Sequence, residues 1–457
     1  MSGSHTRRGT RVWAGALCAS GPAPEHGTGR RERDAGHNCT RAPEVNRTGV
    51  SSPLSPLSPS PAPFHGSRLS QVAPAIALPR IMRIGPGASA ELPEVLRSLG
   101  LSRPLVVTDP FLAEQAFFRD LLQSLSGTGS TPGLFTETVP DPTTTVVDHG
   151  VRVLREGAYD CLVGIGGGSP IDTAKAVALL AGHGGRMRDY KAPTVTDAPA
   201  LPVVAVPTTA GSGSESTRFS IITDVDTDEK MLCAGLALLP QAALVDADLT
   251  LAMPARLTAD TGVDALVHAV EAFVSAKAHP FSDGLAREAM RTLFTHLRTV
   301  YHDPGDRAAR EAMMLGATQA GLAFSNSSVA LVHGMSRPVG AHFHIAHGLS
   351  NAMLMPAVTA FSRPSAPDRY AECARVMGIA GPRDGDEAAS LALVEELRRL
   401  NEDLAVPTPR SHGIDADVWR ELTPLMAEQA LASGSPANNP RVPSADEIES
   451  LYASVYA

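Results

Sequence analysis

The stretch from Tyr159 to Gly182 reads YDCLVGIGGGSPIDTAKAVALLAG. It begins with a short apolar run that has the length of one buried strand. Three glycines follow, and after them comes a segment whose apolar residues have helical spacing. A strand, a glycine-rich turn and a helix in this order are typical of a βαβ unit. The stretch therefore predicts a parallel sheet that is covered by helices.

The same alternation of strand and helix recurs on both sides of this stretch. Residues 103–109 (RPLVVTD) and 201–209 (LPVVAVPTT) are further apolar runs of strand length. From about Leu257 the strand signals stop, and helical periodicity continues to the C-terminus. We therefore predict an α/β dinucleotide-binding domain with a doubly wound parallel sheet at 78–256, and an all-α domain at 257–457.

The N-terminal part of the chain has a different composition. Residues 1–80 contain ten arginines, no lysine and four acidic residues, a net charge of +6 in a chain whose total is −9. They are also rich in proline, serine and glycine, and such a segment buries too little apolar surface to offset chain entropy. A short apolar run around Trp13 is broken by glycine and lacks the cleavage pattern of a signal peptide. We predict that residues 1–77 are a disordered extension.

The overall composition, with 43% hydrophobic and 19% charged residues, is that of an ordinary globular protein. No apolar run reaches the roughly eighteen residues of a membrane helix, and the acidic total gives no reason to expect nucleic acid as a partner. The five cysteines include no CxxC pair, which fits a reducing compartment. We expect a cytoplasmic homo-oligomer, a dimer, that acts on a small molecule.

Two loops at predicted strand ends could bind the phosphates of a dinucleotide. In GGGSPID at 166–172 the glycines let backbone N–H groups approach a pyrophosphate, and the helix start adds partial positive charge. Ser169 as N-cap and Pro170 as first helical residue would explain a plain turn, but not three glycines. The loop PTTAGSGSE at 207–215 adds hydroxyl groups and backbone donors after the next strand. Together the two loops predict one crevice at the edge of the sheet.

Asp109 closes an earlier strand, where its carboxylate could accept hydrogen bonds from a ribose diol. The pair Asp109-Pro110 also has the pattern of a helix cap followed by a first-turn proline, so a purely structural role stays open. A carboxylate at this position would repel a ribose 2′-phosphate. We therefore predict NAD rather than NADP as the cofactor.

A candidate metal site begins with Asp264 and His268. Their i, i+4 spacing places a carboxylate and an imidazole on one face of a helix, where both could bind one ion, although a surface ion pair has the same spacing. Residues 331–348 (LVHGMSRPVGAHFHIAHG) add four histidines. His333 and His347 would lie about 21 Å apart on an unbroken helix.

We expect Pro338 and Gly340 to break the helix between those two histidines, so that the chain can turn back and both can face one ion. His342 and His344 are two residues apart and would face opposite ways on an extended segment. They are more readily explained as wall residues than as ligands.

In combination these motifs resemble the iron-containing (group III) alcohol dehydrogenases. GVDALVHAVEAF matches the family's GxDALxHAxEA helix, and HGMSRPVGAHFHIAHGLSNAMLMP matches its second metal-binding segment. VTDP, VPDPT, GGGSPIDTAK, PTTAGSGSE and NNPRVPSADEIESLY follow in the family's order, so the resemblance runs from about Leu78 to the C-terminus. It implies that the helical domain binds a metal through Asp264, His268, His333 and His347.

The resemblance also implies a dinucleotide in the cleft between the domains and hydride transfer between nicotinamide and a small primary alcohol or aldehyde. It favours Fe(II), although the ligand set suits Zn(II) equally well. The residues that we predict to bind the cofactor are Asp109, Asp141, Gly167, Gly168, Ser169, Asp172, Thr208, Thr209, Ser212 and Lys230.

Arg337 departs from the family pattern, in which many members carry a histidine four residues after the third ligand. Arginine stays protonated and cannot relay a proton, so the proton would leave through water, a cofactor ribose hydroxyl, His342 or His344. We take Arg337 and His344 as the candidate catalytic residues, with Arg337 binding an acidic group of the substrate. The alternative is that Arg337 pairs with a nearby Asp or Glu and never meets substrate.

Three other functions are compatible with parts of the pattern. A hydroxyacid–oxoacid transhydrogenase that retains NAD would turn over with two organic substrates and no added cofactor. A sugar-phosphate cyclase of the dehydroquinate synthase type would need a cationic cluster, and the four lysines do not cluster in the sequence. A non-catalytic nucleotide-binding protein would have no need for four metal ligands.

Overall fold

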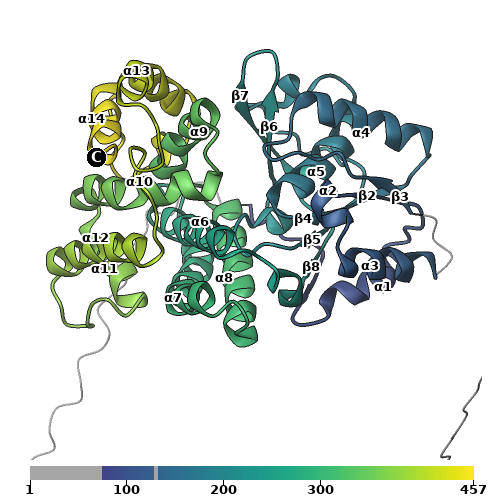
Figure 1. Cartoon of the computed structure of the whole chain (residues 1–457), viewed down its shortest axis with the longest axis horizontal. Coiled ribbons are helices and arrows are strands. Elements are labelled where there is room, and N and C mark those ends of the chain that lie inside the picture. The colour runs from purple at the N-terminus through teal and green to yellow at the C-terminus, as the bar shows by residue number, and fades with distance from the viewer. Residues whose placement is uncertain (1–74, 128–131) are drawn as a thin grey trace, which may run out of the picture. The chain divides into compact units, whose positions relative to one another are not determined.

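The computed structural model describes residues 75–127 and 132–457. The prediction of a disordered extension therefore lies, for residues 1–74, outside the described residues. In Figure 1 the strands and their flanking helices form one lobe, and the helices from α6 onward form the other. This arrangement confirms the predicted fold class, an α/β region with a parallel sheet followed by a helical region.

Six parallel strands form the main sheet, in the order β1-β8-β5-β4-β2-β3. Their bounds are β1 (Ile81–Ile84), β2 (Pro104–Val107), β3 (Gly133–Phe135), β4 (Cys161–Gly166), β5 (Val203–Pro207) and β8 (Ala242–Val245). From β2 the chain goes outward to β3 and then returns past β2 to β4. The strand order reverses between β2 and β4, and ligands bind beyond the carboxyl ends of the strands at such a point.

Helices cover both faces of this sheet because side chains alternate along each strand. Leu105 and Leu162 pack in one core with α4 (Thr144–Glu156) and α5 (Gly168–His183). Val106 and Val163 face the opposite core, which α1 and α3 cover. The other helices of this lobe are α1 (Leu92–Ser98), α2 (Pro110–Ala113) and α3 (Ala116–Ser126). The four central strands are buried on both faces, which explains their continuous apolar runs.

A two-stranded antiparallel hairpin, which the sequence did not predict, lies beside α5. It consists of β6 (Phe219–Asp224) and β7 (Glu229–Ala234). Asp172 of α5 holds it by accepting hydrogen bonds from Ser214 Oγ at 2.5 Å and from the N–H of Ile221 at 2.8 Å. The fully buried Lys175 donates to Ser214 Oγ at 2.9 Å and to the carbonyl of Phe219 at 2.9 Å. These bonds fix the loop after β5 against the start of α5.

The helical region is built around α6 (Ala255–Val274), which is buried on nearly all of its faces and packs against α7, α8 and α10. The remaining helices are α7 (Pro280–His302), α8 (Arg307–Asn326), α9 (Leu331–Phe343), α10 (His347–Ser362), α11 (Pro367–Val376), α12 (Asp386–Asp403), α13 (Ala416–Ala432) and α14 (Ala445–Val455). Short 3-10 turns lie at Ala88–Glu91, Met187–Tyr190, Ser214–Ser216, Leu236–Leu238, Ala247–Thr250, Arg363–Ser365 and Pro436–Asn438. Of the helices in residues 75–127 and 132–457, none has the length and apolarity to cross a membrane.

The two lobes meet backbone to backbone next to the loop after β5. A Cβ atom on Gly213 would lie 2.6 Å from Cα of Gly321 in α8, and one on Gly211 would lie 2.5 Å from Cβ of Thr261 in α6. Gly213 also has a positive φ of 62°, a backbone conformation that favours glycine. The glycines of this loop therefore allow the sheet lobe to contact the helical lobe directly.

Candidate metal and cofactor site

A single cleft of about 1620 Å³ runs from the carboxyl ends of the strands to helices α6 and α9. It is lined by all four predicted metal ligands, by all ten predicted cofactor residues and by Arg337. His344 is not in its lining. The sequence therefore identified residues from segments far apart in the chain that the fold brings to one cavity.

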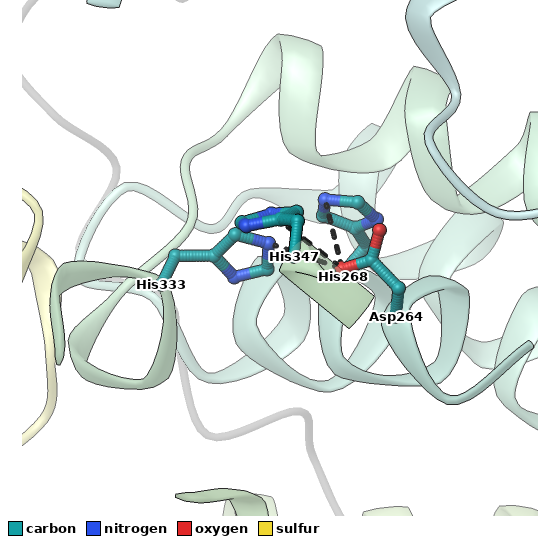
Figure 2. Close-up of side chains that lie close together, drawn as sticks. All are labelled: Asp264, His268, His333 and His347. Atoms are coloured by element: carbon teal, nitrogen blue, oxygen red, sulfur yellow. Dashed lines mark ion pairs between the residues drawn. The ribbon is translucent and has the colours of Figure 1, made fainter. Parts of the chain in front are cut away.

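Three helices supply the four candidate metal ligands. Asp264 and His268 lie one turn apart on α6, His333 is in the first turn of α9, and His347 begins α10. Figure 2 shows that the four side chains point toward one another. The Nε2 atoms of His333, His347 and His268 lie 3.6, 3.7 and 4.0 Å from Oδ1 of Asp264.

These distances fit one metal ion. Two donor atoms that are each about 2.1 Å from an ion can be at most about 4.2 Å apart, and all three Nε2–Oδ1 separations are shorter. The donor atoms of the four residues all lie within 4.8 Å of one another, so the widest pair exceeds this limit by at most about 0.6 Å. The amide Nδ2 of Asn351 lies among them, 2.6 Å from Asp264 Oδ1, 3.3 Å from His333 Nε2 and 3.2 Å from His347 Nε2. Electron pairs therefore converge on one region, as a cation requires.

Glu271 supports the site although the sequence analysis assigned it no role. Its buried carboxylate accepts hydrogen bonds from the N–H groups of Ala330 and Val332, at 2.9 and 2.6 Å, and lies 2.6 Å from Nδ1 of His333. A proton on Nδ1 leaves the lone pair of Nε2 facing the other ligands. Glu271 thus anchors the start of α9 and orients His333, while the ring of Phe324 stacks on His268 at 4.2 Å.

The protonation states also favour a cation. Burial alone would raise the pKa of Asp264, but His268, His347 and His333 outweigh it and hold this pKa well below its usual value. Burial lowers the pKa of His268 to about 4 and that of His347 to about 3. Burial also acts to lower the pKa of His333, but Glu271 and Asp264 raise it above its usual value. Near neutral pH the site therefore offers an ionised carboxylate and two unprotonated imidazoles.

The turn between His333 and His347 differs from the expectation. The helix does not break at Pro338 or Gly340, since α9 continues to Phe343 with Pro338 inside it. The reversal comes from His344, whose positive φ of 53° ends the helix. A single proline removes only one backbone hydrogen bond, and the buried packing of α9 tolerates this loss.

At the other end of the cleft the dinucleotide loops follow β4 and β5. Gly167 is the N-cap of α5, so the helix begins two residues earlier than predicted and Ser169 lies in its first turn instead of capping it. A Cβ on Gly167 would lie 3.3 Å from Thr209, and one on Gly168 would lie 3.2 Å from Cβ of Ser212. The two loops are thus in close contact, and Gly167 and Gly168 both belong to the cleft lining.

The other predicted cofactor residues have partners within the protein. Oδ1 of Asp109 accepts a hydrogen bond from the N–H of Leu112 at 2.8 Å, so this residue does cap α2 while it also lines the cleft. Lys230 forms an ion pair of 2.8 Å with Asp141. Both carboxylate oxygens of Asp172 accept hydrogen bonds, one from Ser214 and one from Ile221, as described above. Contact of these residues with the cofactor remains a prediction.

His342 and His344 are placed away from the cleft. His342 Nε2 lies 2.8 Å from Oε1 of Gln429, and His344 is exposed at the end of α9. Neither belongs to the cleft lining. The geometry therefore gives no support to the catalytic role that the sequence analysis assigned to His344.

Two glycine-rich loops at strand ends and a cluster of four candidate metal ligands line one cleft, an arrangement that suits a metal-dependent dinucleotide oxidoreductase. Residues 79–247 match the family model for iron-containing alcohol dehydrogenases, and residues 258–456 match the C-terminal model of the same family. The chain therefore belongs to the iron-containing alcohol dehydrogenase family. It is an oxidoreductase of alcohols, and iron and a nicotinamide dinucleotide are the cofactors of this class.

Individual relatives agree with this assignment. An NAD-dependent methanol dehydrogenase of Bacillus methanolicus is 36% identical over 374 residues, 82% of this chain and 97% of that protein. The crystal structure of a 1,3-propanediol oxidoreductase matches with a TM-score of 0.81 and 32% identity, over 84% of this chain and all of that one. A sulfoacetaldehyde reductase from Bifidobacterium kashiwanohense in complex with NAD+ matches with a TM-score of 0.75 and 26% identity, over 84% and 99% of the two chains.

Proposed function

We propose that this enzyme interconverts a small primary alcohol and its aldehyde, with Fe(II) bound by Asp264, His268, His333 and His347 and with NAD as the hydride carrier. The observation that carries the proposal is that the four ligands and both dinucleotide loops line one continuous cleft. The reacting carbon can then lie between metal and nicotinamide in a near-attack geometry.

The residues of the chain have separate tasks in this reaction. One aspartate and three histidines hold the ion, which supplies Lewis acidity at the substrate oxygen. Glu271 keeps His333 in the correct tautomer and orientation. The backbone of Gly167 and Gly168 binds the pyrophosphate at the start of α5.

The proton of the alcohol has to leave by a route without histidine. Arg337 stands one turn after His333 and keeps its proton, and His342 and His344 are outside the cleft lining. Water in the cleft or a ribose hydroxyl of the cofactor therefore carries the proton.

The proposal also includes a choice of metal and a choice of dinucleotide. The ligand set suits Fe(II) and Zn(II) alike, and Fe(II) follows from the family. For the dinucleotide, the carboxylate of Asp109 in the cleft lining favours NAD, because it would repel a 2′-phosphate. A related butanol dehydrogenase from Clostridium saccharobutylicum, 34% identical, is NADPH-dependent, so this residue has to be tested directly.

The test is an anaerobic assay of the metal-depleted protein with short aldehydes, NADH and added Fe(II) or Zn(II). We expect reduction that needs metal and consumes NADH in proportion to alcohol formed. Full activity in metal-free protein would refute the proposal. Turnover of a hydroxy acid and an oxo acid without added NADH would instead identify the transhydrogenase.

A further inference from the structure

Arg337 lies beside the metal ligands. It follows His333 by one turn of α9, and both side chains line the cleft. Side chains four residues apart on a helix are neighbours, so the guanidinium lies in the part of the cleft where a substrate at the metal would bind.

This guanidinium has no acidic partner. Among residues 75–127 and 132–457, its side chain makes one hydrogen bond, from Nη1 to Oγ of Ser435 at 3.0 Å, and no carboxylate lies within 4.0 Å of it. By contrast, Arg369 donates to both carboxylate oxygens of Asp283, at 2.8 and 2.7 Å. The pairing that would have given Arg337 a purely structural role is therefore not present.

An unpaired cation in a partly buried position is unfavourable. Burial lowers the pKa of Arg337 to about 10 in spite of the opposing effect of Glu271, and the side chain still carries its charge at neutral pH. The carboxylate of Glu271 cannot serve as the partner, because His333 and two backbone N–H groups already occupy it. The free N–H groups of a guanidinium match the oxygens of a carboxylate, sulfonate or phosphonate.

We propose that Arg337 determines substrate specificity by binding an acidic group at the far end of the substrate. The substrate class is then a small aldehyde or alcohol that carries a carboxylate, sulfonate or phosphonate. This inference rests on the proposed function, because it places the reacting oxygen of the same molecule at the metal.

The cofactor's own phosphates are a poor match for Arg337. The phosphate loops belong to the sheet lobe, at the carboxyl ends of β4 and β5, whereas Arg337 and Ser435 belong to the helical lobe. Two further cleft-lining cations, Arg218 and Lys277, also have no carboxylate within 4.0 Å in the described part of the chain. Arg218 adds to a positive field that attracts an anionic substrate, whereas Lys277 is exposed and interacts only weakly with a bound anion.

The experiment compares two aldehydes of equal length, succinic semialdehyde and butanal, in the Fe(II)-loaded enzyme with NADH. For the wild type we expect kcat/KM to be at least about tenfold higher with the acidic aldehyde. Arg337→Gln should raise KM for succinic semialdehyde by about 10- to 100-fold, the range expected for losing a charged hydrogen bond. KM for butanal should change less than about twofold.

Two control variants separate charge from structure. Lys277→Gln removes an exposed cation from the same cleft. It should change the KM for succinic semialdehyde and the KM for butanal by less than about threefold, since exposed charges interact weakly. Arg337→Lys keeps the charge but loses the paired N–H groups, so its KM for the acidic aldehyde should lie between those of wild type and Arg337→Gln. Metal content and melting temperature are measured for each variant.

A second readout does not depend on turnover. Calorimetry with 4-hydroxybutanoate and the complex of enzyme, Fe(II) and NADH, in which the alcohol has no hydride acceptor, should show at least about tenfold tighter binding to wild type than to Arg337→Gln. Equal binding, or equal losses with both aldehydes, would overturn the role of Arg337. If neither aldehyde is reduced, the proposed function fails, and the calorimetric comparison still decides whether Arg337 binds the anion.

Discussion

The two ends of the cleft are built in different ways. At the metal end, side chains from α6, α9 and α10 converge, and a further buried carboxylate holds one of them in place. At the end where we propose that the dinucleotide binds, two loops line the cleft, and glycines lie where these loops come into close contact. We therefore expect the metal end to lose its ligand binding when one side-chain donor is removed. The opposite end should lose its ligand binding when a methyl group is added to a glycine.

The strongest test of this contrast is the loss of one metal ligand. His268→Ala should lower metal content and reduce kcat/KM by roughly 10³-fold, because the ion contributes several kcal/mol to the transition state. Affinity for NADH should stay within about threefold, since the phosphate loops are untouched. His342→Ala is the matched control, a histidine of α9 that lies outside the cleft lining. Equal losses in both variants would contradict the assignment.

A smaller effect should follow from Glu271→Gln. The amide has one acceptor oxygen, whereas the carboxylate serves three donors, so at least one of the two backbone N–H groups or His333 loses its partner. Metal affinity, measured by competition with a chelator, should fall by about 10- to 100-fold. The kcat at saturating metal should recover most of its wild-type value. An unchanged metal affinity would mean that the three ligand helices alone fix His333.

The opposite end is probed by adding one methyl group. A Cβ on Gly167 would lie 3.3 Å from Thr209, which is tight but tolerable, and Gly167 is one of the two glycines that we propose to bind the pyrophosphate. Gly167→Ala should therefore raise KM for NADH by about tenfold, because the added methyl group keeps the phosphates from the backbone N–H groups. Metal content should remain at the wild-type level. A loss of metal in this variant would show that the two ends are not independent.

The smallest effect is expected at Asp109. Asp109→Asn removes the charge but keeps a side chain that can cap α2, so the fold should be unaffected. The ratio of kcat/KM for NAD over NADP should fall by about tenfold or less, because the repulsion of the 2′-phosphate is lost. Wild-type enzyme that uses both cofactors equally would refute the preference for NAD.

The sequence predicted those features that depend on local spacing. Asp264 and His268 lie one turn apart on one helix, so their shared direction follows from the i, i+4 rule. His333 and His347 come together because the chain turns between them. The sequence analysis placed this turn at Pro338 and Gly340, which was wrong. Its true position at His344 reflects the left-handed conformation of a single residue, and no periodicity reports that conformation.

Features that depend on tertiary contact were missed for a different reason. Glu271 acts on residues 59 to 62 positions later in the chain. The one local signal was its place one turn after His268 and two turns after Asp264, on the same side of α6. The strand β7 was missed because it mixes charged and apolar residues. Its side chains are buried on one face of the hairpin only. The sequence could not show whether Arg337 has an acidic neighbour. Its hydrogen-bond partner in the fold is Ser435, which lies 98 residues further along the chain.

The backbone contact between Gly213 and Gly321 has a mechanical consequence. Where two lobes touch without side chains, one can tilt against the other with little steric resistance, so we expect this contact to serve as the pivot of any opening motion. Residues near the pivot, such as Thr261, would move least, and those at the far rim of the cleft would travel furthest. An alanine at either glycine would then act as a wedge, with a Cβ only 2.6 to 2.8 Å from the opposite Cα, and would set the angle at which the enzyme closes on its substrates.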